Sequence, residues 1–349
     1  MNKIVEVMRR EHLYVLLLIF IILVNVIMFL PADIRLKGQM AKSKVETKKM
    51  DEDLFIKRDV LEKMFYEKKY LALLFSLTSL LVFFVLFLGM AIDVTLLSLK
   101  LTKKKIEIYT YKLQTAKWSL WDVAKVAILF LFFGYMILII ESLLIRMLPL
   151  LKDDNFRMIL NSSLLDTLTV VFILYFTVGQ YKEKLISLGI SFKNFFKNVF
   201  YGIVGYIATV PILIVLLAIT AAVANLIKYV PPKQPVVDLF LKEKDVAFLT
   251  YTSIFAAIVG PIIEELFFRA FMYNAMKKSI GIFWSMLITA CVFAALHTHI
   301  IGFLPIMVLG ILLAYLYEKT GTLVSSVTVH TIHNFTMLLF VFLMKQLKA

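Results

Sequence analysis

Two adjacent carboxylates, Glu264 and Glu265, lie within a long apolar stretch and are the groups in this sequence best placed to do chemistry. Charged side chains at membrane depth are costly unless they are paired or hydrated, so they mark a functional site by default. On a helix, Glu265 and Arg269 share one face because they are four residues apart, and an ion pair between them would neutralise both charges. Glu264 is rotated by about 100° from Glu265 and is left unpaired by Arg269, which suits a general base. Pro261 lacks a backbone N–H, so it can kink this span and open space for water.

Two further pairs of candidate residues lie in later apolar stretches. Phe293 and His297 are four residues apart, and so are His330 and Asn334, with His333 also one turn from His330. Each feature has a structural explanation when it is taken alone. A buried ion pair can be purely structural, a histidine at a span end is typical of a snorkelling residue, and an asparagine within a span is typical of a contact between helices.

Taken together, these groups predict a hydrolytic pocket that combines one base, two or three imidazoles and a carboxamide from three spans. Polar donors of this kind can stabilise an oxyanion, which is usually the largest catalytic contribution. A zinc site is the main alternative chemistry, but the compact His-Glu-x-x-His motif is absent and asparagine is a poor zinc ligand. The single cysteine, Cys291, has no base beside it on its helix. The sequence therefore predicts neither a metal nor another cofactor.

The composition indicates that membrane-spanning helices position these residues. The chain has 349 residues, of which 61% are hydrophobic and 18% are charged, a balance that is unusual for a soluble domain. Because about 20 apolar residues cross a bilayer, the sequence predicts an all-α polytopic transmembrane bundle of about 8–9 spans. The candidate spans are 13–30, 70–99, 123–151, 160–179, 199–227, 246–268, 280–298, 300–317 and 323–344.

The net charge of +14 does not indicate a nucleic-acid partner, because the lysines cluster in short loops between apolar runs and no binding signature for RNA or DNA is present. Their distribution predicts a cytoplasmic N-terminus, with 13–30 as a retained anchor instead of a signal peptide. Segment 179–196 mixes lysines with aromatic residues and predicts an interfacial helix on the inner leaflet. The polar segment 32–69 predicts a small extramembrane helix pair or a solvated loop.

The order, spacing and apolar setting of the three motifs resemble those of the CPBP family, which contains CAAX-protease-type and bacteriocin-processing (Abi) intramembrane proteases. The resemblance covers about 246–344, and the phrase 315–324 is also similar to the stretch before the last family motif. The motifs are Glu264-Glu265-x-x-x-Arg269, Phe293-x-x-x-His297 and His330-x-x-x-Asn334.

The resemblance implies an intramembrane glutamic endopeptidase. In that family reading, Glu264 activates water, His297 shares the proton transfer, and His330 and Asn334 orient the water and hold the oxyanion. Glu265, Arg269 and Phe293 support the site.

The expected substrate is a membrane-associated protein or peptide, cut within or beside the lipid bilayer of the cell (cytoplasmic) membrane. We expect 1–120 to form an N-terminal anchor region with two spans and the polar loop, and 121–349 to form the CPBP-like catalytic bundle. Two alternatives stay open. One is a non-proteolytic membrane scaffold or regulator of the same family. The other is a transporter that uses Glu264 as a proton site, although the paired halves typical of transporters are not evident.

Overall fold

A computed structural model describes residues 11–29, 69–104, 108, 113, 115–229, 235–297 and 300–348. Within these residues every regular element is a helix, so the predicted all-α class is confirmed. Seven of the described helices are long and apolar enough to cross a membrane, which confirms a polytopic bundle. The predicted polar segment 32–69 lies outside the described residues except for its last position.

The helix boundaries follow the apolar runs. The first five predicted spans correspond to α2 (His12–Phe29), α5 (Lys69–Leu101), α6 (Leu120–Leu144), α7 (Asp154–Leu174) and α8 (Phe195–Leu226). A short helix, α9 (Pro235–Lys242), precedes α10 (Val246–Ile254), α11 (Gly260–Glu265) and α12 (Asn274–Leu296), and the chain ends with α13 (Ile300–Thr320) and α14 (Leu323–Lys348).

The helical run Val246–Leu296 is too long for one crossing. Its 51 residues would extend roughly 76 Å as a straight helix, against a hydrocarbon core of about 30 Å. Gly281 interrupts α12 with φ 80° and ψ 174°, a conformation that glycine adopts without a steric penalty. This break falls at the start of the predicted span 280–298.

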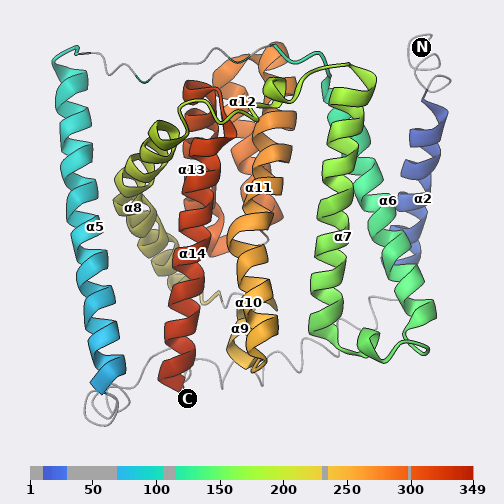
Figure 1. Cartoon of the computed structure of the whole chain (residues 1–349), viewed down its shortest axis with the longest axis horizontal. Coiled ribbons are helices and arrows are strands. Elements are labelled where there is room, and N and C mark those ends of the chain that lie inside the picture. Colours follow the sequence, from blue (N-terminus) through green and yellow to red (C-terminus); the bar gives the residue numbers. More distant parts are fainter. Residues whose placement is uncertain are drawn as a thin grey trace. The chain divides into compact units, whose positions relative to one another are not determined.

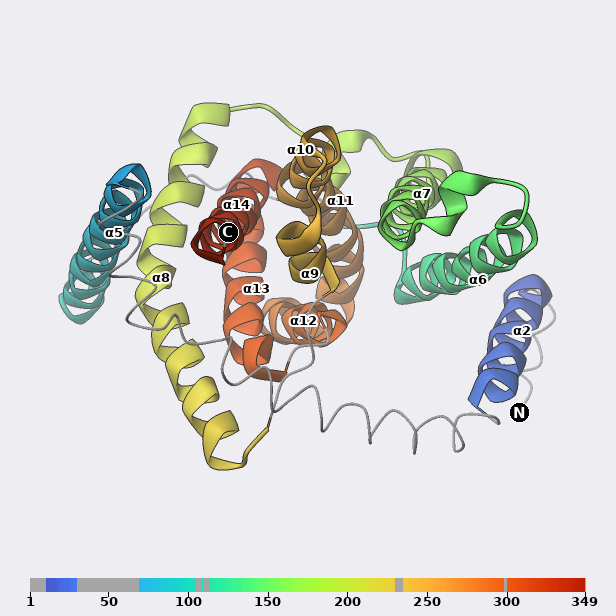
Figure 2. The same ribbon diagram turned by 90° about the horizontal axis from the view of Figure 1, so that it is seen from below.

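The chain divides into two compact units. One comprises the described residues of 1–57 and 120–174, and within it α6 packs against both α2 and α7 (Figure 2). The other comprises the described residues of 58–119 and 175–349. Within this second unit, α8 packs against α5, α13 and α14, and α12 packs against α13 (Figures 1 and 2). The predicted functional division near residue 120 stays a prediction.

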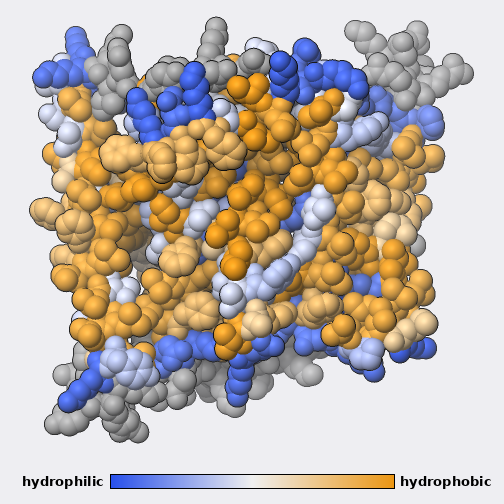
Figure 3. All heavy atoms as spheres, viewed as in Figure 1, coloured by the Kyte–Doolittle hydropathy of each residue, from blue (hydrophilic) through white to orange (hydrophobic). Residues whose placement is uncertain are grey.

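The three motifs all lie in the second unit, whose apolar core is formed by residues of α8, α13 and α14. On the face in Figure 3, apolar side chains cover the middle of the helices and hydrophilic ones gather at the helix ends. Because lipid is as apolar as a protein core, close packing of small residues contributes much of the association between such helices. Gly310 of α13 is one example, since a Cβ atom there would lie 3.0 Å from the Cβ of Ala290 in α12. The core residues are Tyr206, Leu213, Leu309, Leu313, Leu316 and Val329.

The predicted interfacial helix at 179–196 is wrong. After the π-helical turn Tyr175–Gln180, the chain forms only a short 3-10 turn, Leu185–Leu188, before α8 begins. Lys182, Gly189 and Asn194 have positive φ, which is incompatible with a continuing right-handed helix. The alternation of lysines and aromatic residues does not reveal these backbone breaks.

Candidate active site

The two adjacent glutamates lie on a short helix that is flanked by two π-helical segments. Glu264 and Glu265 end α11, which follows Phe255–Val259 and precedes Leu266–Tyr273. The preceding segment widens because the N–H of Gly260 bonds to the carbonyl of Phe255, five residues earlier. Such widened turns are often found at functional sites. Pro261 lies in the first turn of α11, directly after this widened segment.

Arg269 and Glu265 form a completely buried ion pair. Arg269 Nη1 lies 2.8 Å from Glu265 Oε1, and the two side chains are 1% and 0% exposed. Arg269 Nη2 also donates to the carbonyl of Gly310 at 3.3 Å, and its guanidinium carbon lies 4.5 Å from the centre of the Phe293 ring. These contacts fix the Glu265 carboxylate and join the first two motifs.

His330 connects the two glutamates, although it lies 65 residues from Glu265 in sequence. Its Nδ1 is 3.0 Å from Glu265 Oε1, and its Nε2 is 3.7 Å from Glu264 Oε2. An ionised carboxylate can only accept hydrogen bonds, so Glu265 holds the proton on Nδ1 and directs Nε2 of a neutral ring toward Glu264. The result is a chain of polar groups that runs from Arg269 through Glu265 and His330 to Glu264.

Glu264 differs from Glu265 in exposure and in partners. The Glu264 side chain is 38% exposed, whereas that of Glu265 is fully buried. Among the described residues, Glu264 Oε2 has no hydrogen-bond partner, and its 3.7 Å separation from His330 is too long for a direct bond. Oε2 itself is buried, so the exposed part of the Glu264 side chain lies in its other atoms.

His297 lies next to this chain of polar groups, and Phe293 contacts both. Its Nδ1 is 2.7 Å from the carbonyl of Phe293, which leaves Nε2 free of that contact. The Phe293 ring centre lies 4.6 Å from that of His297 and 5.5 Å from that of His330. Phe293 therefore packs against both imidazoles and against Arg269, and His297 itself is exposed.

Asn334 and His333 make contacts that the motifs alone do not indicate. Asn334 Nδ2 donates to the carbonyl of Ala256 at 2.8 Å, one turn along α14 from His330. His333 Nδ1 lies 3.4 Å from the hydroxyl of Tyr206 on α8, with the two rings nearly perpendicular. Tyr206 and Ala256 could not be predicted as partners, because neither belongs to a motif and both lie far from residue 330 in sequence.

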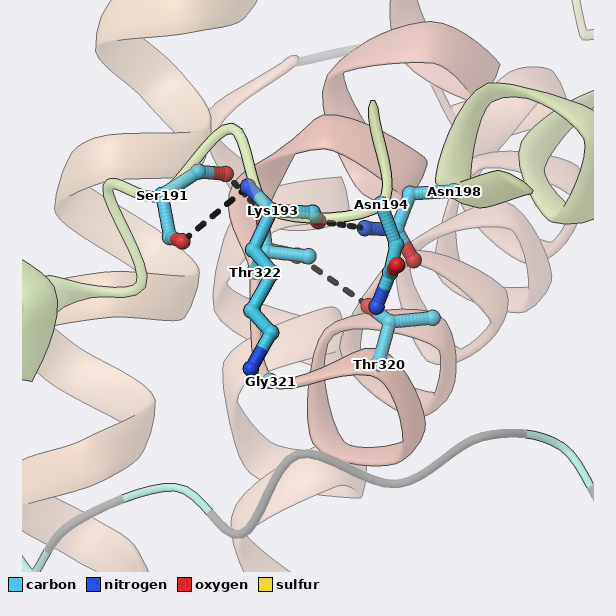
Figure 4. Close-up of a pocket in the computed structure, with 7 residues that line it drawn as sticks. All are labelled: Ser191, Lys193, Asn194, Asn198, Thr320, Gly321 and Thr322. Atoms are coloured by element: carbon cyan, nitrogen blue, oxygen red, sulfur yellow. Dashed lines mark hydrogen bonds between the residues drawn. The ribbon is translucent and has the colours of Figure 1, made fainter. Parts of the chain in front are cut away.

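Two other kinds of site bear on function, a metal centre and a ligand cavity. Within the described residues, no group of three or more His, Cys, Asp and Glu side chains could hold a metal ion. A small polar cavity of about 10 Å³ lies where the segment before α8 meets the turn before α14 (Figure 4). It has room for about one water molecule. Hydrogen bonds connect its walls; one runs from Thr322 Oγ1 to the Ser191 carbonyl at 3.0 Å. The cavity therefore marks a structural contact between these two segments.

The fold and this cluster define a class of protein, the multi-pass, all-helical membrane proteins. Its site combines a buried carboxylate, guanidinium and imidazole with one partly exposed carboxylate. Residues 246–336 match the family model described as "Type II CAAX prenyl endopeptidase Rce1-like". This match contains all three motifs and confirms the predicted resemblance to the CPBP family for that region.

A curated relative agrees with this assignment. The chain is 30% identical over 81 residues to the "Putative membrane peptidase YdiL" of Bacillus subtilis (strain 168). The aligned part is 23% of this chain and spans only 33% of the length of that relative. No solved structure matches the chain significantly.

Proposed function

We propose that this protein is an intramembrane endopeptidase in which Glu264 activates water. The observation that carries the proposal is the pair of adjacent glutamates with opposite environments. Glu265 is buried against Arg269 and His330, whereas Glu264 is 38% exposed and faces Nε2 of the same imidazole. This arrangement supports one carboxylate as the base and the other as the group that orients the histidine.

In the proposed reaction, Glu264 removes a proton from water, and the hydroxide attacks the carbonyl carbon of the peptide bond. The developing oxyanion would be stabilised by a polar N–H group, for which the second amide N–H of Asn334 is the candidate. His330, with its proton on Nδ1, would instead orient the attacking water by accepting a hydrogen bond at Nε2. The proton held by Glu264 then passes to the leaving amine, directly or through His297, and the C–N bond breaks. Arg269, Glu265 and Phe293 hold the imidazoles in place.

The proposed substrate is a peptide segment of a membrane-associated protein, because the site lies among helices that are long and apolar enough to cross a bilayer. The proposed location is the cell membrane with the N-terminus in the cytoplasm, which rests on the lysine-rich short loops. The matching family model is that of Rce1-like type II CAAX prenyl endopeptidases. A prenylated substrate is therefore one class to include in an assay.

The test is cleavage of tagged membrane peptides by the purified protein in lipid, with and without a prenyl group. Wild-type protein should cleave at least one class of peptide, and Glu264→Gln should abolish turnover without loss of folded protein. Binding of the peptide with no cleavage by wild type would instead favour a scaffold. Proton-coupled uptake into vesicles that requires Glu264 would favour a transporter.

A further inference from the structure

The carbonyl of Ala256 has no donor in its own helix at the two positions that normally supply one. In an α-helix the donor would be Gly260, but its N–H bonds to the carbonyl of Phe255. In a π-helix the donor would be residue 261, which is proline and has no N–H. The combination of a widened turn and Pro261 therefore leaves this carbonyl without a donor at either of these two positions.

Asn334 supplies the missing donor from another helix. Its Nδ2 lies 2.8 Å from the Ala256 carbonyl oxygen. Within a bilayer no bulk water is available to satisfy a freed backbone group, so side chains of neighbouring helices must do so. The asparagine in the third motif thus donates to a carbonyl whose usual donor is missing because of the proline before the first motif.

The contact has a consequence for Glu264. Asn334 and His330 lie one turn apart on α14, and they contact the run 255–265 at two points: the Ala256 carbonyl and the Glu265 carboxylate. Two contacts fix both the position of this run along its axis and its rotation about that axis. One contact would leave the rotation free. Since Glu264 is next to Glu265, this rotation decides whether Glu264 faces His330.

We propose that Asn334 is a positioning residue, which holds the Pro261-interrupted helix so that Glu264 faces the imidazole of His330. This role uses one of the two amide N–H groups of Asn334 and leaves the other for an oxyanion. The catalytic consequence rests on the proposed peptidase function, whereas the contact itself can be tested by stability alone.

The experiment is a double-mutant cycle between Asn334→Leu and Pro261→Ala, measured as the Tm of the full-length protein in detergent. Leucine has nearly the shape of asparagine but no donor. We expect it to lower Tm by about 2–6 °C, because it leaves a buried acceptor unsatisfied. Alanine at 261 restores a backbone N–H, so the helix can satisfy Ala256 itself. The Tm loss caused by Asn334→Leu should then fall by more than half.

Pro305→Ala is the matched control, because Pro305 also lies inside a helix, but that helix is α13. In that background Asn334→Leu should cost as much as in the wild type. Equal Tm losses in all three backgrounds would overturn the proposal. If Asn334→Leu does not yield folded protein, folding of the Pro261→Ala double variant supports the proposal. Failure of that double variant while Pro261→Ala alone folds rejects it.

Activity distinguishes positioning from direct contact with the reacting atoms. A misplacement of about 1 Å can cost about 100-fold in rate. We expect the kcat loss caused by Asn334→Leu to be at least ~10-fold smaller in the Pro261→Ala background. Equal losses in both backgrounds would mean that Asn334 acts on the reacting atoms and would reject the positioning role. Coupling in Tm without any cleavage by wild type would instead reject the proposed peptidase function and keep the contact.

Discussion

Replacing each of the two adjacent glutamates by glutamine should separate stability from catalysis. Glu265 Oε1 lies 2.8 Å from Arg269 Nη1 and 3.0 Å from His330 Nδ1, and the Glu265 side chain is fully buried. Glu265→Gln therefore leaves a buried guanidinium without a counter-charge. Breaking such a pair costs about 3–5 kcal/mol. For a chain of this size that corresponds to a fall in Tm of roughly 5–15 °C.

Glu264→Gln is the matched comparison, since the side chain is 38% exposed and has no hydrogen bond within the described residues to lose at Oε2. Its cost should stay within about 0.5 kcal/mol, because the amide keeps the shape of this partly exposed side chain. Its peptidase activity should nevertheless disappear, because the amide has the shape of the carboxylate but not its basicity.

The assay is thermal unfolding in detergent together with peptide cleavage in lipid. A third variant, Glu265→Gln combined with Arg269→Met, controls for the charge. Removing both charges should recover much of the lost stability, because a buried ion pair can often be replaced by apolar groups at little cost. The reasoning would be refuted if Glu264→Gln and Glu265→Gln lowered Tm equally and left equal residual activity.

Three further predictions follow from other contacts. Tyr206→Phe should lower the free energy of unfolding by about 1 kcal/mol, because it loses a 3.4 Å contact with His333 but keeps the ring packing. A loss above ~3 kcal/mol in thermal unfolding would contradict this. Hydrogen bonds from Lys117 and Ser187 hold the pKa of Glu183 below its ordinary value of 4.5, so this group stabilises the fold above that value and loses its contribution as the pH falls below it. Glu183→Gln should thus flatten the fall of Tm between neutral and acidic pH, and an unchanged pH profile would count against it. Peptidase activity should survive strong chelators, because the proposed mechanism needs no metal ion. The expectation would be overturned if the protein held about one zinc per chain, if chelation removed both the zinc and the activity, and if added zinc restored the activity.

Much of this protein could be predicted from local sequence. The apolar runs identify the helices, because every backbone group in a span must be satisfied within a helix and about 20 residues are needed to cross. The spacing of Glu265 and Arg269 predicts their contact, since residues four apart share a helix face. The failure at 179–196 has an equally local origin, because positive φ at Lys182, Gly189 and Asn194 breaks the chain there.

The tertiary structure alone decided which groups meet across the bundle. In a membrane the lipid-facing and the buried sides of a helix are both apolar, so the sequence does not indicate which side of α8 or α14 faces inward. For that reason the contact of His330 with both glutamates, and that of Tyr206 with His333, depend on how the helices rotate as they pack. The sequence determined that Pro261 would disturb its helix, but only the folded chain brought Asn334 to the carbonyl that this proline leaves without a donor.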